Sequence, residues 1–523
     1  MVDESFMAGK SSENEDLLKE IRRKDGIIES LNQNIVDLNK INEELASDLM
    51  KFENFTTHSI VWNTYQIFTT RFITKIIPPN SYRGEFYFRV LVVMKKMFGS
   101  RDGQVRPGDT ARTYCEEPGQ VPVEDNHGLS ESYYRAFYLY LRRNATIKSP
   151  VYEEARDNPP IIDEKTPGLL AFYLPQYHPI PENDMWWGKG FTDWINVVKA
   201  LPQFVGHYQP HLPDELGFYD LRRIETLTRQ IDLARQFGIH GFCFHYYWFD
   251  GKKLLERPLN QFLTHPELQF NFCICWANEN WTRRWDGKEN EILIAQEYSP
   301  GYELAFIRDL DPVMRDPRYI RIKGKPLILV YCAQNLPDAK NCASIWREYC
   351  REQGIGEIFL VAAQTFSFKD PRPLGFDASV EFPPHNLRSS GDITGSINPV
   401  NPDFSGAIKD YRKIVEEKLF AFESPFTLFK CVAPGWDNTA RRINNPLILQ
   451  GSTPALYRRW LIDMMNHTVN NLQPDEQFVF INAWNEWAEG AHLEPDRKFG
   501  YAYLNATAEA LQEMQKKKIL TSG

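Results

Sequence analysis

Gln477-Phe-Val-Phe-Ile-Asn-Ala-Trp-Asn-Glu-Trp-Ala-Glu-Gly490 is the stretch that decides the predicted fold. It begins with a short apolar run, rich in aromatic and β-branched residues, that follows the turn-like Gln473-Pro-Asp475. Such a run is typical of a buried parallel strand. Glu486 and Glu489 then stand three residues apart, just past the predicted carboxyl end of that strand. In α/β enzymes the reacting groups usually lie at this end of the strands.

Paired carboxylates among tryptophans predict chemistry on a glycosidic bond. Making or breaking an acetal C–O bond needs one group that handles a proton at the departing oxygen and another that manages charge at the anomeric carbon. Glu486 and Glu489 can fill both roles, and the neighbouring aromatic rings can stack on sugar faces. The alternative is a solvated pair on the first turn of a helix. The aromatic surroundings favour the functional interpretation.

Outward from this stretch, strand-like and helix-like segments alternate from Pro167 to the end of the chain. Alternation of this kind predicts parallel strands joined by right-handed crossovers, and eight strands are enough to close a barrel. Helices are predicted at 223–237, 343–353 and 454–471, where apolar residues recur at three- and four-residue spacing. The predicted strands are 169–173, 240–245, 270–275, 327–331, 358–362, 378–382, 428–433 and 478–482.

Polar and aromatic residues gather where these strands end. Because the carboxyl ends of barrel strands meet at one mouth, residues far apart in the sequence are expected to become neighbours there. Any one of them, His245 for example, is more often a satisfied buried side chain than a ligand, but so many together favour a binding site. The candidate substrate-binding residues are Tyr173, Tyr177, His178, Trp186, Trp187, Trp194, His245, Tyr246, Trp276, Asn278, Glu279, Trp436, Trp484 and Asn485.

Several motifs resemble those of the glycoside hydrolase family 99-like proteins, including the WbsX-like group of polysaccharide-biosynthesis proteins. Besides the block from Asn485 to Gly490, with Glu494-Pro495 after it, five blocks match in order over roughly residues 167 to 515. The resemblance implies a TIM-type (β/α)8 barrel. The five blocks are Phe172-Tyr-Leu-Pro-Gln-Tyr-His-Pro179, Trp186-Trp-Gly-Lys-Gly-Phe-Thr-Asp-Trp194, His207-Tyr-Gln-Pro210, Gly241-Phe-Cys-Phe-His-Tyr-Tyr-Trp248 and Trp276-Ala-Asn-Glu-Asn-Trp-Thr282.

The resemblance also implies catalytic roles. Glu486 would take the proton from a sugar 2-hydroxyl, which attacks C1 and forms an anhydro sugar, while Glu489 would be the general acid and base at the glycosidic oxygen. Glu489 would then have to be protonated at rest, and burial beside Trp487 is a way to raise its pKa.

The family resemblance leaves three functions open. A retaining glycosyltransferase that builds a surface polysaccharide, of the O-antigen or capsule type, is placed first. The alternatives are an endo-acting glycoside hydrolase of the endo-mannosidase type and a non-catalytic glycan-binding scaffold. An enzyme should have both glutamates facing one open aromatic cleft, whereas a scaffold can have them ion-paired and covered.

The N-terminal part predicts a parallel dimeric coiled coil over residues 13–52. Ile21, Ile28 and Ile35 occupy heptad position a, Asn42 follows at the same position, and leucine dominates position d. This pattern favours two strands, so a homodimer is expected. Residues 53–166 are expected to form a mainly helical connector before the barrel at 167–516. Its aromatic and basic stretch 133–143 suggests either peripheral membrane contact or a helix docked on the barrel.

Composition excludes other classes. The net charge of −9 provides no basic stripe, so no nucleic acid partner is expected. No export signal or 18-residue apolar window is found, and a cytoplasmic location is expected. Most of the eight cysteines fall in apolar runs, as buried thiols do. Neither Cys273-Ile-Cys275 nor Asp309-Leu-Asp311 has the context of a metal motif, so neither a metal nor a cofactor is expected.

Overall fold

The computed structural model describes residues 148–157, 160, 166–204, 206–283, 288–385, 391–418 and 423–521. The chain divides into two compact units, residues 1–105 and 106–523, and all described residues belong to the second. The predicted coiled coil at 13–52, nearly all of the connector at 53–166 and the stretch 133–143 lie outside the described residues. The predictions of a homodimer and of membrane contact therefore stay predictions.

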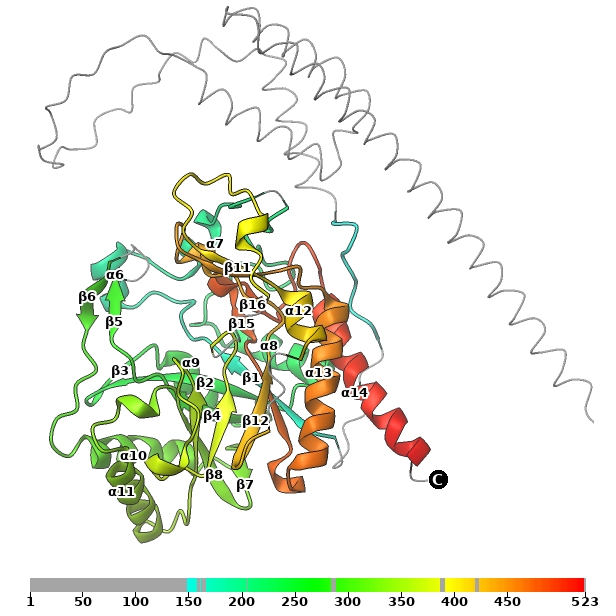
Figure 1. Cartoon of the computed structure of the whole chain (residues 1–523). Helices are drawn as coiled ribbons and strands as arrows, with labels where there is room; N and C mark the ends of the chain where they lie inside the picture. The colour runs from blue at the N-terminus through cyan, green and yellow to red at the C-terminus, as the bar shows by residue number, and fades with distance from the viewer. Residues whose placement is uncertain are drawn as a thin grey trace, which may run out of the picture. The chain divides into compact units, whose positions relative to one another are not determined.

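Eight parallel strands form a closed barrel within the described residues (Figure 1). The barrel closes because β1 pairs with β2 on one side and with β14 on the other, with Tyr173 opposite Phe244 and Gly168 opposite Phe478. All eight predicted strands are confirmed within a few residues of their expected bounds. They are β1 (Gly168–Tyr173), β2 (Gly241–Phe249), β4 (Asn271–Trp276), β8 (Lys325–Val330), β9 (Phe359–Gln364), β10 (Ala378–Glu381), β12 (Thr427–Val432) and β14 (Phe478–Ile481).

Helices surround the barrel, and the three predicted helices are confirmed as α8, α11 and α13. Helix α13 begins with Thr453, whose side chain accepts a hydrogen bond from the backbone N–H of Leu456, and with a proline in its first turn. The helices are α6 (Pro181–Trp187), α7 (Trp194–Lys199), α8 (Ile224–Gln236), α9 (Arg257–Thr264), α10 (Tyr302–Met314), α11 (Ala339–Glu352), α12 (Tyr411–Glu416), α13 (Pro454–Asn471) and α14 (Ala502–Thr521).

Short additional strands lie outside the eight strands of the barrel. Two of them, β15 and β16, form the small antiparallel hairpin that carries the Glu486 region. Among the helices of the described residues, none is both long and apolar enough to cross a membrane. The additional strands are β3 (Lys252–Leu254), β5 (Trp281–Arg283), β6 (Lys288–Ile294), β7 (Arg321–Ile322), β11 (Ala407–Asp410), β13 (Leu447–Gln450), β15 (Asn485–Glu486) and β16 (Ala491–His492).

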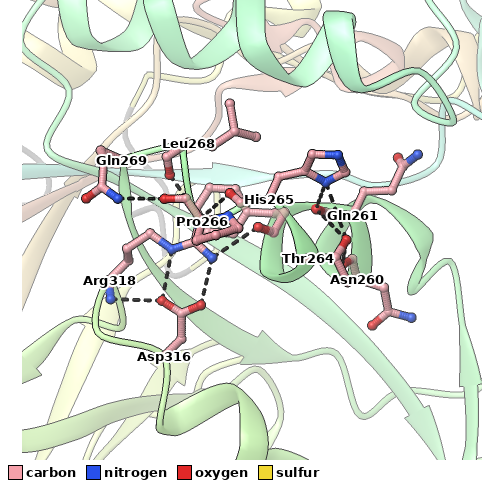
Figure 2. A network of polar contacts seen from close by, with 10 residues as sticks. Asn260, Gln261, Thr264, His265, Pro266, Leu268, Gln269, Asp316 and Arg318 are labelled. Carbon is pink, nitrogen blue, oxygen red and sulfur yellow. Dashed lines mark hydrogen bonds and ion pairs between the residues drawn. The ribbon is translucent and has the colours of Figure 1, made fainter.

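A buried arginine joins the end of α9 to the segment that leads into β4 (Figure 2). The guanidinium of Arg318 donates hydrogen bonds to the carbonyl oxygens of Phe262, His265 and Leu268 at 2.9–3.0 Å, and it pairs with Asp316 at 2.7 Å. The carbonyls at a helix end have no partner within the helix. Each of the three carbonyls accepts one backbone N–H, and Arg318 adds a second, charged donor to each.

Two buried charged residues pair between neighbouring strands of the barrel. Lys430 of β12 and Glu381 of β10 lie 2.7 Å apart, and their side chains are 0% and 2% exposed. Burial raises the pKa of Glu381, and the ammonium of Lys430 opposes that rise. Glu381 is the last residue of β10, and its carboxylate is held in the ion pair with Lys430.

The two sequence motifs that were set aside have structural partners. Asp309 accepts a hydrogen bond from the indole of Trp248 at 2.7 Å, and Asp311 accepts one from the hydroxyl of Tyr349 at 3.0 Å. Both aspartates lie on α10 rather than after a strand. Cys273, Cys275 and the other described cysteines are buried and form no disulfide among themselves.

Candidate active site

A cleft of about 420 Å³ opens where the barrel strands end. Its wall comes from segments that follow nearly every barrel strand, as the TIM-type topology requires. The residues that line it are Leu174, Gln176, Trp187, His245, Tyr247, Ala277, Glu279, Asn280, Trp281, Thr282, Leu293, Tyr331, Phe366, Phe382, Pro384, His385, Trp436, Asn438, Arg441, Arg442, Leu447, Asn482, Glu486 and Glu489.

Glu486 and Glu489 both reach this cleft from the segment after β14. Glu486 ends β15 and Glu489 ends a 3-10 turn, Trp487–Glu489, after which the backbone reverses at Gly490. Gly490 has a φ of 58°, a left-handed conformation that favours glycine. The side chain of Glu486 is 8% exposed and that of Glu489 is 21% exposed. The hairpin thus presents one nearly buried and one accessible carboxylate to the same space.

A single arginine connects the two glutamates. The guanidinium of Arg441 lies 3.2 Å from the carboxylate of Glu486 and 2.8 Å from that of Glu489. The same guanidinium lies 2.5 Å from Asp193, the residue that precedes α7. Arg441 follows the 3-10 turn Asn438–Ala440 in the segment after β12. Three carboxylates from two parts of the chain therefore share one cation.

This excess of carboxylates affects the ionisation of Glu486. Burial raises the pKa of Glu486 well above its usual range, Glu489 and Asp193 raise it further, and Arg441 opposes them. Two carboxylates that share one site cannot both ionise freely, so they titrate as a pair. The arrangement favours a state in which the two glutamates hold one proton between them, as a general acid and a general base require.

Polar atoms in the cleft wall are available to a ligand. The indole N–H of Trp436, the amide oxygen of Gln176 and Nδ1 of His245 are buried and have no hydrogen-bond partner among the described residues. Burial lowers the pKa of His245 to about 4, so its ring is neutral near pH 7. Buried polar groups normally find partners, and the hydroxyls of a sugar would supply them. Trp187 and Trp281 add aromatic surface.

The structure brings six of the predicted site residues into the cleft wall, and ten lie outside it. The six are Trp187, His245, Glu279, Trp436, Glu486 and Glu489. The ten that do not line the cleft are Tyr173, Tyr177, His178, Trp186, Trp194, Tyr246, Trp276, Asn278, Trp484 and Asn485.

Several residues outside the cleft hold its wall in place. The side-chain amide of Asn485 pairs with both backbone groups of Leu174, accepting from N–H at 2.7 Å and donating to C=O at 3.0 Å. The hydroxyl of Tyr177 donates to the carbonyl of Asn485 at 3.0 Å and accepts from the backbone N–H of Trp487 at 3.1 Å. These contacts fix the hairpin that carries the glutamates.

Tyr246 and Trp276 lie on barrel strands and face away from the cleft because successive strand residues point to opposite sides. Trp276, for example, stacks on Phe306 of α10 with ring centroids 4.1 Å apart. Trp194 donates its indole N–H to the carbonyl of Tyr219 at 2.9 Å. Trp186 lies next to the cleft, because the centroid of its ring is 5.9 Å from that of Trp281, which lines the cleft.

Sequence reasoning missed Arg441 and Asp193. Both lie in loops well after their strands, where charged residues are usually solvated. The available signal for Arg441 was its place in the same segment as Trp436, a predicted site residue. Both glutamates face one aromatic cleft, as expected of an enzyme. Both are also ion-paired with Arg441, as expected of a scaffold.

The sequence is similar to a known family and to curated proteins. The family model described as "Glycosyltransferase WbsX" matches residues 169–507. The protein WxcX, named as uncharacterized, of two strains of Xanthomonas campestris pv. campestris is 50% identical over 343 residues, which cover 66% of this chain and 49% of WxcX. The chain thus spans about half the length of these curated relatives.

Two solved structures are similar to the chain at low sequence identity. A glycoside hydrolase-like protein has a TM-score of 0.43 and 16% identity, with 69% of this chain and 98% of the other covered. An endo-α-mannosidase of glycoside hydrolase family 99 from Bacteroides thetaiotaomicron has a TM-score of 0.42 and 15% identity, with 68% and 99% covered. The family match, which spans more than half of the chain, shows that the protein belongs to the WbsX glycosyltransferase family of carbohydrate-active enzymes.

Proposed function

We propose that the protein is a retaining glycosyltransferase that acts in the assembly of a surface polysaccharide, with Glu486 and Glu489 as its catalytic pair. The observation that carries this proposal is that both carboxylates line one cleft and share the guanidinium of Arg441. The unpartnered polar atoms of the cleft wall and its aromatic rings support a sugar as the ligand.

In the first step, Glu486 removes the proton from the 2-hydroxyl of the donor sugar. The resulting oxygen nucleophile attacks C1 while the bond from C1 to the leaving oxygen breaks, and Glu489 gives its proton to that oxygen. A three-membered anhydro ring forms, and the leaving oxygen departs protonated. Burial raises the pKa of Glu486, so Glu486 acts as the base only in its ionised form, which Arg441 favours, and in that form it accepts a proton readily.

In the second step, a hydroxyl of the acceptor sugar attacks C1 of the anhydro ring. Glu489, now ionised, takes the proton of that hydroxyl, and the protonated Glu486 returns a proton to the 2-oxygen as the ring opens. The two inversions at C1 give net retention, and both glutamates end in their starting states. If water replaces the acceptor sugar, the same groups carry out hydrolysis, which is the alternative function.

Arg441 and Asp193 position this pair. Arg441 contacts both glutamates, so it holds their carboxylates close together while partly offsetting their charge. Asp193 contacts Arg441 from the opposite loop and restricts the orientation of its planar guanidinium.

The proposal is tested with a panel of nucleotide-sugars and lipid-linked sugars as donors and with oligosaccharide acceptors, read by mass spectrometry. Glu486→Gln and Glu489→Gln should each lower turnover by about 100-fold or more, because each removes proton transfer. Glu348→Gln, an exposed position on α11, is the matched control and should leave turnover unchanged. Turnover by both cleft variants at the level of the parent would refute the catalytic roles.

Running the reaction in ¹⁸O-labelled water separates transfer from hydrolysis. A transferase product carries no label, whereas hydrolysis places ¹⁸O at the released reducing end. A chain that binds oligosaccharides but turns over none of the panel, with the Gln variants binding equally well, would indicate the glycan-binding scaffold.

The division of roles has its own test. A donor whose leaving group needs no proton, such as a glycosyl fluoride, combined with azide as an acceptor that needs no deprotonation, should restore turnover to Glu489→Gln but not to Glu486→Gln. Rescue of Glu486→Gln alone would reverse the assignment of acid and base.

A further inference from the structure

A second cavity of about 120 Å³ lies behind the hairpin that carries the glutamates. Its wall is formed by the segment 206–211, by the segment after β12 and by the residues that follow Gly490. Three potential metal ligands, His211, His492 and Asp496, meet in this cavity. One ligand atom from each lies within 4.8 Å of the other two.

The distances between these atoms suit a small coordination sphere. Nδ1 of His211 lies 2.9 Å from Nε2 of His492, and the carboxylate of Asp496 lies 3.7 Å from the same Nε2. Ligands arranged tetrahedrally at roughly 2.1 Å from a zinc ion are about 3.4 Å apart. The two distances from Nε2 of His492 are within about half an ångström of this value, and the third, between His211 and Asp496, is at most 4.8 Å.

The environment prepares His492 for this role. Its Nδ1 lies 3.0 Å from the carbonyl oxygen of Glu494 and can act only as a donor there, so the lone pair is on Nε2, which faces the other two groups. Protein ligands to metals commonly have such a partner on the far ring nitrogen. The His492 ring also stacks on Trp487, with ring centroids 3.8 Å apart. Burial lowers the pKa of His492 to about 4, so the ring is in its neutral, ligating form near pH 7.

Asp496 directs one carboxylate oxygen at the histidines, and the hydroxyl of Tyr208 also donates a hydrogen bond to its carboxylate. Its Oδ1 accepts the backbone N–H groups of Lys498 and Phe499 at 2.9 and 2.5 Å, while the other oxygen faces His492. The side chain of Asp496 is 3% exposed, so keeping its anion away from water carries a penalty in free energy. A cation at this position would remove that penalty.

We propose that His211, His492 and Asp496 form a site for one divalent transition-metal ion, with zinc as the best match. Two imidazoles and one carboxylate favour such an ion over Ca²⁺ or Mg²⁺, which prefer oxygen ligands. The cavity leaves room for water as a further ligand. This site departs from the expectation, drawn from the sequence, that the protein holds no metal.

The ion would have a structural role and would take no part in the reaction. His492 ends β16, directly after the turn that carries Glu489, while His211 comes from the segment that precedes α8. Binding one ion to both would tie the glutamate hairpin to a distant part of the chain. The site is independent of the proposed glycosyl transfer, because it requires only that the three side chains meet.

Lys498 is the group that most opposes a cation here. Its ammonium lies 4.2 Å from the centre of the Tyr208 ring, and both residues line the same cavity. Its charge also acts on Asp496. Removing this charge should therefore strengthen metal binding. If the two histidines only form a hydrogen bond and bind no metal, removing it should have no such effect.

The test uses the full chain after treatment with a chelator, titrated with Zn²⁺ in a calorimeter and with Co²⁺ in a visible spectrometer. The parent should bind about one Zn²⁺ at this site, and Co²⁺ should give the absorption of a low-symmetry nitrogen and oxygen site. His211→Ala and the isosteric Asp496→Asn should weaken that binding by about 100-fold. Lys498→Met should tighten it by about tenfold.

His467→Ala, a half-buried histidine on α13 outside the cluster, is the control and should bind as the parent does. Thermal unfolding of each variant without metal establishes that it is folded. Zn²⁺ binding that is absent from the parent, or equal in the parent, His211→Ala and Asp496→Asn, would overturn the proposal and leave an ordinary hydrogen bond between two histidines. Weaker binding by Lys498→Met would also count against it.

Discussion

Arg441 is the residue on which the electrostatics of the cleft depends. Its guanidinium meets three carboxylates while only 11% of its side chain is exposed. Water therefore screens these interactions little, and each contact affects the ionisation of the others. Burial opposes the charge of Arg441, but Asp193, Glu486 and Glu489 together raise its pKa well above the usual range.

Arg441→Met should shift the pH dependence of turnover. The positive charge lowers the pKa of Glu486, so its removal raises that pKa further. The base is then protonated up to a higher pH, and the acidic limb of the profile of kcat against pH should move upward by about one unit. Arg441→Lys keeps a charge and should show a smaller shift. If kcat falls at every pH and the acidic limb stays at the same pH, Arg441 has only a steric role.

At the scale of elements, strands were easier to predict than site loops. The run Phe478–Ile481 is apolar and Thr427–Val432 is mostly so, apart from Thr427 and Lys430, and strands buried on both faces need such runs. The two-residue strands β15 and β16 lack any repeating pattern, because tertiary contacts such as the Asn485 pairing with Leu174 hold them. The aromatic side chain of Trp436 near a predicted strand end marked it as a site residue. Arg441 could not be identified in this way, because its position depends on the conformation of the loop after β12.

The end of α9 should be sensitive to Arg318. Arg318→Met removes the guanidinium from three carbonyls and from the carboxylate of Asp316, which keep only backbone N–H donors, in a place where Arg318 is 6% exposed. We expect a loss of about 3 kcal/mol in the free energy of unfolding, measured by denaturant titration. The exposed Arg308→Met on α10 is the control. Equal stability of the two variants would contradict the importance of this network.

The buried pair between β10 and β12 allows a double-mutant test. Lys430→Met leaves the carboxylate of Glu381 buried and unpaired, and it should cost about 3 to 5 kcal/mol near pH 7. Adding Glu381→Gln to that variant removes the uncompensated charge and should recover part of the loss. Thermal unfolding of both single variants and of the double variant measures the coupling. Strictly additive losses would show that the two side chains act independently.

At the scale of the whole molecule, pH acts through buried carboxyls. Glu494 accepts hydrogen bonds from Tyr219, Gln230 and Trp487 at 2.6–2.8 Å, yet burial raises its pKa to about 7. The folded state therefore binds this proton more tightly than the unfolded state does. Its contribution to stability is complete below the ordinary pKa near 4.5 and is lost as pH rises through 7.

Glu494→Gln should remove this dependence. Compared with the parent, the variant should gain up to about 3 kcal/mol of relative stability between pH 4.5 and pH 8, because glutamine has no proton to lose. Denaturant unfolding of both proteins at the two pH values gives the difference. Glu348→Gln, on an exposed helix face, should show no such change. A difference between parent and Glu494→Gln that is the same at both pH values would refute the shift.

The N-terminal heptads predict the assembly of the full chain. Light scattering should give the mass of a dimer for the whole protein and of a monomer after deletion of residues 1–52. The cleft and its glutamates belong to one chain, so turnover per chain should survive the deletion. A dimer that persists after the deletion would place the contact between subunits elsewhere.

The pairing of β1 with β14 has a consequence during synthesis. Gly168 and Phe478 lie side by side although about 310 residues separate them along the chain. Until the ribosome has added β14, β1 and β12 each keep an unpaired edge of the kind that recruits other strands. At typical translation speeds the segment from β12 to β14 takes roughly 2 to 9 s. The nascent protein is thus most prone to aggregation just before the strand that delivers Glu486 and Glu489 arrives, and chaperone demand should peak there.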